Sequence, residues 1–240
     1  MLTLFHVADL PIEIGQHFVI DGDDGHHASR VLRVEPGEEL LLSDGKGSWS
    51  RVTISSVDKK SVSVTVLETG VQRALPTTIT VIQALTKGDR AKEAIELLTE
   101  SGADVIIPWQ SSRSIGKAEA GVEKLRTTAR EASKQSRRFW VPEVKDVAST
   151  KEILSIIATS DLAIVLHESA VTKFSDVFAD LNEVAHVAIV IGPEGGLTDE
   201  ELELMQSAGA KVVVLGRPIL RSAHAGIAAV SAVSAALKIW

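Results

Sequence analysis

The sequence predicts an α/β protein, a mostly parallel sheet flanked by helices, preceded by a small β-barrel. From residue 78 onward, β-branched runs alternate with amphipathic or alanine-rich segments of helical length, which is typical of a parallel sheet covered on both faces. Up to about residue 68, β-branched runs are separated only by Asp-Gly, Pro-Gly and Gly-Lys-Gly turns, a pattern typical of a small all-β domain.

The first domain is expected to span residues 1–70. Its strands are predicted at residues 16–20, 39–43, 50–57 and 61–67. Arg30 and Arg33 follow His26-His27 on a predicted helix turn, where they could contact phosphates or be ordinary surface arginines. Residues 71–77 show no periodicity and are interpreted as a linker.

The second domain is expected at residues 78–240. Strands are predicted at residues 78–83, 104–107, 162–166, 187–191 and 211–215. Helices are predicted at residues 89–101, within 119–136, at 199–207 and in the alanine-rich C-terminal segment.

Two helix boundaries carry clear local signals. The helix at 89–101 has apolar residues at i, i+3, i+4 and i+7, and Gly102 stands where a left-handed cap is favoured. Thr198 and Glu201 form a predicted capping box, with Leu197 and Leu202 as its hydrophobic staple. The residues just before Thr198 therefore form a strand-to-helix turn.

Composition and charge narrow the function classes. Because the chain has no cysteine, disulfides, thiolate metal sites and a cysteine nucleophile are excluded. The adjacent His26 and His27 have no third metal ligand nearby in the sequence, so no metal is expected. The chain shows neither a leader pattern nor a run of about 18 apolar residues, so we expect a cytoplasmic protein without a membrane span.

The net charge of -7 is unevenly distributed. Residues 110–145 hold nine Lys or Arg against four Glu, whereas residues 180–206 hold seven acidic residues and no Lys or Arg. The basic segment could meet a polyanion, or it could be the solvated face of a helix.

Two glycine-containing turns follow buried-strand signals, at Gly192-Pro-Glu-Gly-Gly196 and at Leu215-Gly216. Such turns can bring bare backbone groups close to a ligand, although glycine also serves turn geometry alone. The first turn lacks the phosphate-loop and dinucleotide fingerprints, and Glu194 would repel a pyrophosphate. A cationic sulfonium fits better, which favours S-adenosylmethionine over ATP or NAD.

Several blocks in order resemble one known family. They are His27-Ala-Ser-Arg-Val-Leu-Arg33, Gln83-Ala-Leu-Thr-Lys-Gly-Asp-Arg90, Pro108 with Ser112-Arg-Ser114, Glu131-Ala-Ser-Lys-Gln-Ser136 with Arg138, Val141-Pro-Glu-Val144 and His167-Glu168. With the two glycine turns, they resemble the RsmE-type 16S rRNA uracil-N3 methyltransferases of the SPOUT class.

The resemblance implies a PUA-like RNA-binding barrel at residues 1–70 and, at 78–240, a methyltransferase domain with a deep trefoil knot. It implies methyl transfer from S-adenosylmethionine to N3 of a uridine near the 3' end of 16S rRNA, in the small ribosomal subunit. It also implies a homodimer that places the basic region of one subunit beside the cofactor turn of the other.

The site residues follow from the same resemblance. The cofactor is expected to contact Leu166, His167, Glu168, Gly192, Pro193, Glu194, Gly195, Gly196, Leu215, Gly216, Ile219, Leu220 and Arg221. RNA is expected to contact Arg30, Arg33, Lys87, Arg90, Arg113, Lys134, Arg137 and Arg138. Arg221 is the expected catalytic residue, stabilising negative charge on a uracil carbonyl.

Two places leave the interpretation open. Ser222-Ala-His224 stands where many relatives have Thr-Glu-Thr, so a mechanism needing that carboxylate is in doubt, and His224 either opens a helix or handles a proton. Phe139-Trp140 beside Arg137-Arg138 could stack a splayed base or pack in a core.

Three other functions remain alternatives. The first is a SPOUT methyltransferase with another target, such as a ribose 2'-hydroxyl in tRNA. The second is a non-catalytic RNA-binding or ribosome-assembly factor. The third is a nucleotide-dependent metabolic enzyme, which the absence of a phosphate cradle disfavours.

Overall fold

A computed structural model describes residues 2–115, 121–178 and 184–240. The chain divides into two compact units, Met1–Ala74 with Ser133–Val141, and Leu75–Ala132 with Pro142–Trp240. Residues 133–141 lie inside the range expected for the second domain, and their contacts group them with the first unit.

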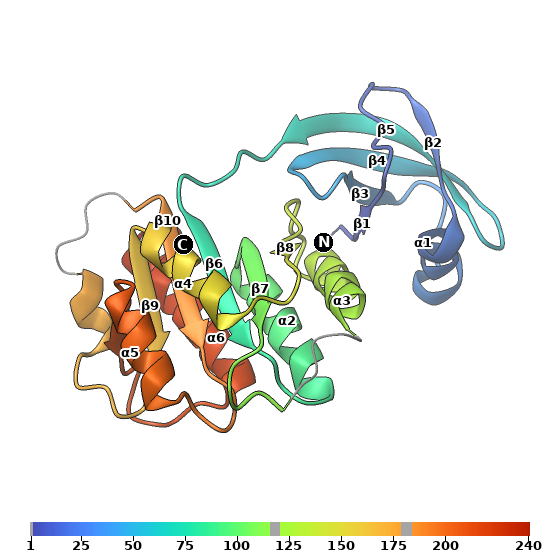
Figure 1. Cartoon of the computed structure of the whole chain (residues 1–240). Helices are drawn as coiled ribbons and strands as arrows, with labels where there is room; N and C mark the ends of the chain where they lie inside the picture. Colours follow the sequence, from blue (N-terminus) through green and yellow to red (C-terminus); the bar gives the residue numbers. More distant parts are fainter. Residues whose placement is uncertain (1, 116–120, 179–183) are drawn as a thin grey trace. The chain divides into compact units, whose positions relative to one another are not determined.

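The first unit is built on a five-stranded sheet with the order β1-β3-β4-β5-β2 (Figure 1). The strands are β1 (Leu4–His6), β2 (His17–Ile20), β3 (Glu39–Ser43), β4 (Ser48–Val57) and β5 (Val62–Val71). The β1–β3 pair is parallel and the others are antiparallel. Alternate residues such as Val62, Val64 and Val66 on β5 are buried in its core, as the period of a half-buried strand requires.

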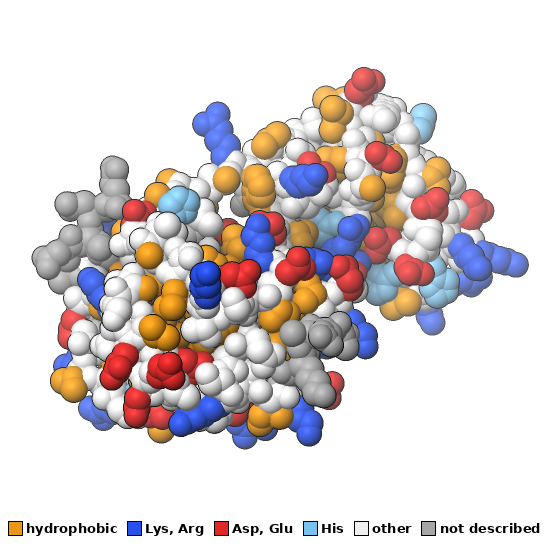
Figure 2. All heavy atoms as spheres, viewed as in Figure 1, with side chains coloured by type: hydrophobic (Ala, Val, Ile, Leu, Met, Phe, Trp, Pro, Cys, Tyr) orange, Lys and Arg blue, Asp and Glu red, His pale blue; other side chains and the backbone are white. Residues whose placement is uncertain are grey.

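A helical segment follows β2, as the sequence predicted. It consists of the short helix α1 (Gly22–His26) and the π-helical η1 (His27–Leu32), which ends at Arg33 in the left-handed conformation (φ 55°). Figure 2 shows histidine, lysine and arginine side chains gathered at the α1–η1 end of this unit.

Residues 133–141 pack on the first unit through aromatic side chains. The Phe139 and Trp49 rings are stacked, with centroids 5.7 Å apart. Trp140 donates its indole N–H to the Gln72 carbonyl at 2.9 Å, and Gly47 N–H donates to the Phe139 carbonyl at 2.9 Å. Of the two interpretations of Phe139-Trp140, the structure supports packing.

The second unit contains a six-stranded, all-parallel sheet with the order β11-β9-β10-β6-β7-β8. The strands are β6 (Thr78–Ala84), β7 (Val105–Trp109), β8 (Glu143–Val144), β9 (Leu162–Leu166), β10 (His186–Ile191) and β11 (Lys211–Val213). The helices are α2 (Asp89–Ser101), α3 (Val122–Gln135), α4 (Thr150–Thr159), α5 (Asp199–Ser207), α6 (Ser222–Ala236) and the 3-10 helix η3 (Phe174–Phe178). The predicted α/β class is confirmed.

Helices cover both faces of the parallel sheet. One core cluster holds the inward residues of α2 and α6 with Ala129 of α3, and the other holds those of α4 and α5. The neighbouring strands β6 and β10 thus lead to helices on opposite faces, α2 and α5. Ligands of open α/β sheets bind at such a switch point, outside the carboxyl ends of the strands. No helix among the described residues has the length and apolarity to cross a membrane.

Several elements differ from expectation. β1, the two-residue β8, α4 and η3 were not predicted, and β5 extends to Val71, the first residue of the expected linker. Ser149 and Glu152 form a capping box that marks the start of α4. β11 ends at Val213 and not at residue 215, because Val214 instead exchanges backbone hydrogen bonds with Thr172 and Phe174.

Candidate active site

The turn between β10 and α5 is held by the predicted capping box. Glu201 accepts hydrogen bonds from the Thr198 N–H at 2.9 Å and its hydroxyl at 3.1 Å, while the Glu201 N–H donates to the Thr198 hydroxyl at 3.1 Å. The Gly196 N–H donates to the Pro193 carbonyl at 3.0 Å. Gly196 has φ +72°, which favours glycine at this position.

A buried hydrogen-bond chain joins this turn to the start of α6. Gln83, on β6, donates from its side-chain amide to the Ser222 hydroxyl at 2.9 Å, and that hydroxyl donates to the Gly192 carbonyl at 2.7 Å. Gln83 is 5% exposed and Ser222 is 9% exposed. Three segments that are far apart in sequence are therefore fixed to one another at the carboxyl end of the sheet.

A cavity of about 460 Å³ lies at this end of the sheet. It is lined by the residues after β9, the turn after β10, the segment after β11 and the first turns of α2 and α6. Its apolar lining includes Leu166, Ile191, Leu197 and Leu215. The volume is that of a small-molecule site.

Charged groups of both signs line the cavity. Glu93, Glu168 and Glu194 supply carboxylates, and Arg90 pairs with Glu194 at 3.2 Å. Arg217 and Arg221 also line it and are exposed. Among the described residues, no carboxylate lies within ion-pair distance of Arg217 or Arg221.

His224 lies at the start of α6 and faces Glu93 of α2, with 3.5 Å between imidazole Nε2 and the carboxylate. Glu93 lines the cavity, whereas His224 is not part of its lining. Ala223, at the position where the family resemblance led us to look for a glutamate, does line the cavity.

The structure brings most of the expected cofactor residues together. Every expected cofactor residue except Gly195 lines the cavity. Gly195 instead faces Arg113. Arg90, which was expected to contact RNA, also lines the cavity. Its other lining residues were not expected from the sequence: Glu93, Ile191, Leu197, Val214, Arg217, Pro218, Ser222, Ala223 and Ala225.

The expected RNA residues are divided between the two units. Arg30, Arg33, Lys134, Arg137 and Arg138 belong to the first unit, and Lys87, Arg90 and Arg113 to the second. Several are held by protein groups: Arg30 donates to the Lys59 carbonyl, and Lys134 pairs with Asp24 at 2.8 Å. Arg113 donates to carbonyls of the turn before α5.

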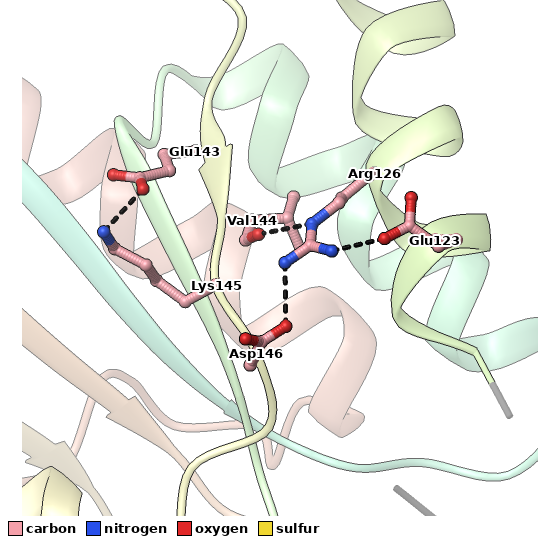
Figure 3. A network of polar contacts seen from close by, with 6 residues as sticks. All are labelled: Glu123, Arg126, Glu143, Val144, Lys145 and Asp146. Atoms are coloured by element: carbon pink, nitrogen blue, oxygen red, sulfur yellow. Dashed lines mark hydrogen bonds and ion pairs between the residues drawn. The ribbon is translucent and has the colours of Figure 1, made fainter. Parts of the chain in front are cut away.

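Part of the basic segment is neutralised within the protein, as Figure 3 shows. Arg126 binds Glu123, the Val144 carbonyl at 3.1 Å and Asp146 at 2.8 Å. Glu123 and Asp146 raise the pKa of the Arg126 guanidinium. Lys145 pairs with Glu143 at 2.5 Å. The charge excess in the sequence therefore overstates the cations available to a polyanion.

Within the described ranges, no group of three or more His, Cys, Asp or Glu side chains is placed to hold a metal ion.

Comparison with known proteins assigns the chain to a family. Residues 73–234 match an RNA methyltransferase domain, and residues 20–67 match an RNA methyltransferase PUA domain. The ribosomal RNA small subunit methyltransferase E of Mycobacterium bovis is 35% identical, over 99% of this chain and 93% of that protein. The enzyme of the same name from Bacillus subtilis is 34% identical, over 93% of this chain and 91% of that protein.

Solved structures support the same family assignment. The ribosomal RNA small subunit methyltransferase E of Neisseria gonorrhoeae, bound to S-adenosyl methionine, is 26% identical with a TM-score of 0.87, covering 100% of this chain and 98% of that one. A Legionella pneumophila methyltransferase with bound SAM is 28% identical with a TM-score of 0.87, covering 98% of each chain. This chain therefore belongs to the RNA methyltransferase family with a PUA domain, in the group of the ribosomal RNA small subunit methyltransferases E.

Proposed function

We propose that this chain transfers a methyl group from S-adenosylmethionine to N3 of a uridine in 16S rRNA of the small ribosomal subunit. The observation that carries the proposal is the cavity at the carboxyl ends of β9, β10 and β11, enclosed by the two glycine turns. The structures of two relatives of the same fold contain this cofactor, which supports the proposal.

The cavity fits the chemistry of S-adenosylmethionine. Leu166, Ile191 and Leu215 offer an apolar surface for an adenine ring, and the turns bring backbone groups to the same space. Glu168 and Glu93 favour a cation, while the lining offers no glycine-rich phosphate loop with a lysine. We propose all the expected cofactor residues except Gly195 as cofactor contacts.

When bound, S-adenosylmethionine supplies an electrophilic methyl group. N3 of uracil carries an imide proton, which must pass to water as the methyl arrives and the sulfonium becomes a neutral thioether. As the proton leaves, negative charge spreads from N3 to the adjacent carbonyls. Arg221 lines the cavity, is exposed and keeps its charge, so its guanidinium can donate to such a carbonyl oxygen. Arg221 is our candidate catalytic residue.

RNA contacts are proposed on both units. Residues 1–70 would act as a PUA-like RNA-binding domain, joined by residues 71–77 to the methyltransferase domain at 78–240. Arg30 lies on η1 and Arg33 directly follows it. Arg137, Arg138, Lys87, Lys134 and Arg90 complete this proposed set, and Lys134 and Arg90 also make ion pairs within the protein. Phosphate contacts by such residues place the RNA in register.

We further propose a cytoplasmic homodimer with a trefoil knot in the C-terminal part of the second domain. The knot is supported by the path after β11: this strand lies at the sheet edge, yet α6 packs against α2 and the central strands. Exposed apolar side chains at Ile219, Leu220 and Trp240 support a partner surface. Light scattering tests the dimer, and a crystal structure traced through residues 162–236 tests the knot.

The function is tested by transfer of labelled methyl to small ribosomal subunits isolated from a strain lacking this gene, with the modified nucleoside identified by mass. Labelled 3-methyluridine in 16S rRNA is the expected result. Label in another nucleoside, including a ribose 2'-O-methyl product, would overturn the target. A chain that binds no S-adenosylmethionine would act as a non-catalytic rRNA-binding factor.

A further inference from the structure

We propose that Arg113 is a positioning residue that holds the turn between β10 and α5 in its cofactor-receiving shape, and that it is not an RNA ligand. The inference rests on the proposed function, because it assumes that this turn receives S-adenosylmethionine. It departs from the expectation that Arg113 binds RNA, and three observations within the second unit support it.

The first observation is the hydrogen bonding of the guanidinium. One terminal nitrogen of Arg113 donates to the Gly195 carbonyl at 3.1 Å and to the Leu197 carbonyl at 3.4 Å. These two carbonyls flank Gly196, the residue with positive φ that also lines the cavity. A charged donor shared by the carbonyls on either side of Gly196 opposes rotation of the peptide groups that shape the cavity wall.

The second observation concerns Gly195. A Cβ atom at Gly195 would lie 3.3 Å from the Arg113 Cβ and 3.7 Å from its Cδ, so the arginine stem lies directly across the glycine. Gly195 is also the one expected cofactor residue that does not line the cavity. The absence of a side chain at this position serves the approach of Arg113.

The third observation is that the segment carrying Arg113 is itself anchored. The Ser112 N–H donates to Glu201 at 2.8 Å, and Glu201 is 3% exposed. The Ser111 and Ser114 hydroxyls are 2.7 Å apart, which closes the segment on itself. Arg113 is therefore presented to the turn from a fixed support, as a positioning residue requires.

The test measures cofactor and RNA binding separately, in the full chain. Arg113→Met keeps most of the stem that packs on Gly195 and removes the donors. We expect it to weaken S-adenosylmethionine binding about tenfold or more by calorimetry, which corresponds to about 1.4 kcal/mol. Binding of purified 16S rRNA, and its dependence on salt, should stay unchanged. Arg113→Lys should recover part of the cofactor affinity, because a single nitrogen makes both bonds.

Arg73→Met is the matched control, since Arg73 is exposed and outside the cavity lining. We expect its cofactor affinity to equal that of the unmodified chain. Gly195→Ala should act in the same direction as Arg113→Met, because its Cβ displaces the arginine stem. The two changes combined should weaken binding by less than the product of their separate effects.

Amide hydrogen exchange of the chain without cofactor gives a second readout. Arg113→Met should speed exchange at residues 194–197 while exchange in the sheet core and the melting temperature change little.

The outcomes are distinguishable. If the unmodified chain binds no S-adenosylmethionine, the proposed function fails, and exchange still reports whether Arg113 holds the turn. If the unmodified chain binds the cofactor and Arg113→Met binds it equally well, the positioning role is overturned. Loss of RNA affinity with a shallower salt dependence, at unchanged cofactor affinity, would return Arg113 to the RNA-binding set.

Discussion

Glutamine at position 201 would remove one charge from the most heavily hydrogen-bonded carboxylate near the cavity. Glu201 accepts from the Thr198 N–H, the Thr198 hydroxyl and the Ser112 N–H, at 2.9, 3.1 and 2.8 Å. A glutamine has only one accepting oxygen, so its NH2 group must face a backbone N–H that also needs an acceptor. Both the cap of α5 and the link to the Ser112 segment are weakened together.

The expected cost follows from these contacts. A hydrogen bond to a charged group contributes about 1.5–3 kcal/mol, and a buried donor left without an acceptor costs about 1–3 kcal/mol. Glu201→Gln should therefore lower the free energy of unfolding of the second unit by about 2 kcal/mol or more. For a chain of this size, 2 kcal/mol lowers the melting temperature by about 4–8 °C.

The effect should depend on pH in a definite direction. Burial alone would raise the pKa of Glu201, but hydrogen bonds from Ser112 and Thr198 outweigh it and lower the pKa below its ordinary value of 4.5. Because the folded pKa is depressed, the stabilisation is present above the unfolded pKa and is lost as pH falls through the folded pKa. The unmodified chain and Glu201→Gln should thus differ fully at neutral pH, and the difference should shrink as pH falls below the ordinary pKa of a glutamate and through the lowered pKa of the folded chain.

Thermal and urea unfolding across pH 3–8 provide the assay. Glu200→Gln is the matched control, because Glu200 is the exposed neighbour on the same helical turn and should change stability by less than about 0.5 kcal/mol. Equal losses in the two variants, or a Glu201→Gln difference that does not shrink in acid, would refute the assignment of the stabilisation to this carboxylate.

Three further predictions concern catalysis, the buried hydrogen-bond chain and RNA binding. Arg221→Ala should leave cofactor affinity within a few-fold while sharply reducing turnover on small subunits; turnover equal to that of the unmodified chain would remove Arg221 from catalysis. Ser222→Ala leaves the Gln83 amide without its hydroxyl partner and should cost about 1–3 kcal/mol in urea unfolding, whereas Ser222→Thr, which keeps the hydroxyl, should cost less. Reversing the charges of Arg137 and Arg138 should weaken rRNA binding and lower its salt slope by about one for each phosphate that is no longer neutralised, and an unchanged slope would show that these side chains meet only solvent.

Local signals in the sequence predicted the elements of the second unit closely. α2, α5 and β9 have the expected bounds, because a left-handed glycine, a capping box and a short apolar run each act within one turn or strand. α4 carries an equally good capping box at Ser149 and could have been predicted from it. The end of β11 could not, because residues beyond Val213 pair with a segment about 40 residues earlier in the chain.

The pocket itself was largely predictable, because its walls are turns that follow recognisable strands. The hydrogen-bond and ion-pair partners of the charged side chains at and near the pocket were not predictable. In the sequence, three side chains were expected to be free to bind RNA: Arg113, Arg90 and Lys134. In the structure, each donates to a protein acceptor, and these acceptors lie 82, 104 and 110 residues away in sequence. The sequence predicted the capping-box role of Glu201, but not its burial or its hydrogen bond with the Ser112 N–H, 89 residues earlier.

Most strands and helices, the caps of α2 and α5 and the two glycine turns were predictable from the sequence alone, since these features depend on neighbouring residues and on backbone sterics. Which charges are paired inside the protein, and which face the cavity, became clear only in the folded chain. Pairing of charges depends on distances of a few ångströms between segments remote in sequence, and a charge count along the chain carries no information about those distances.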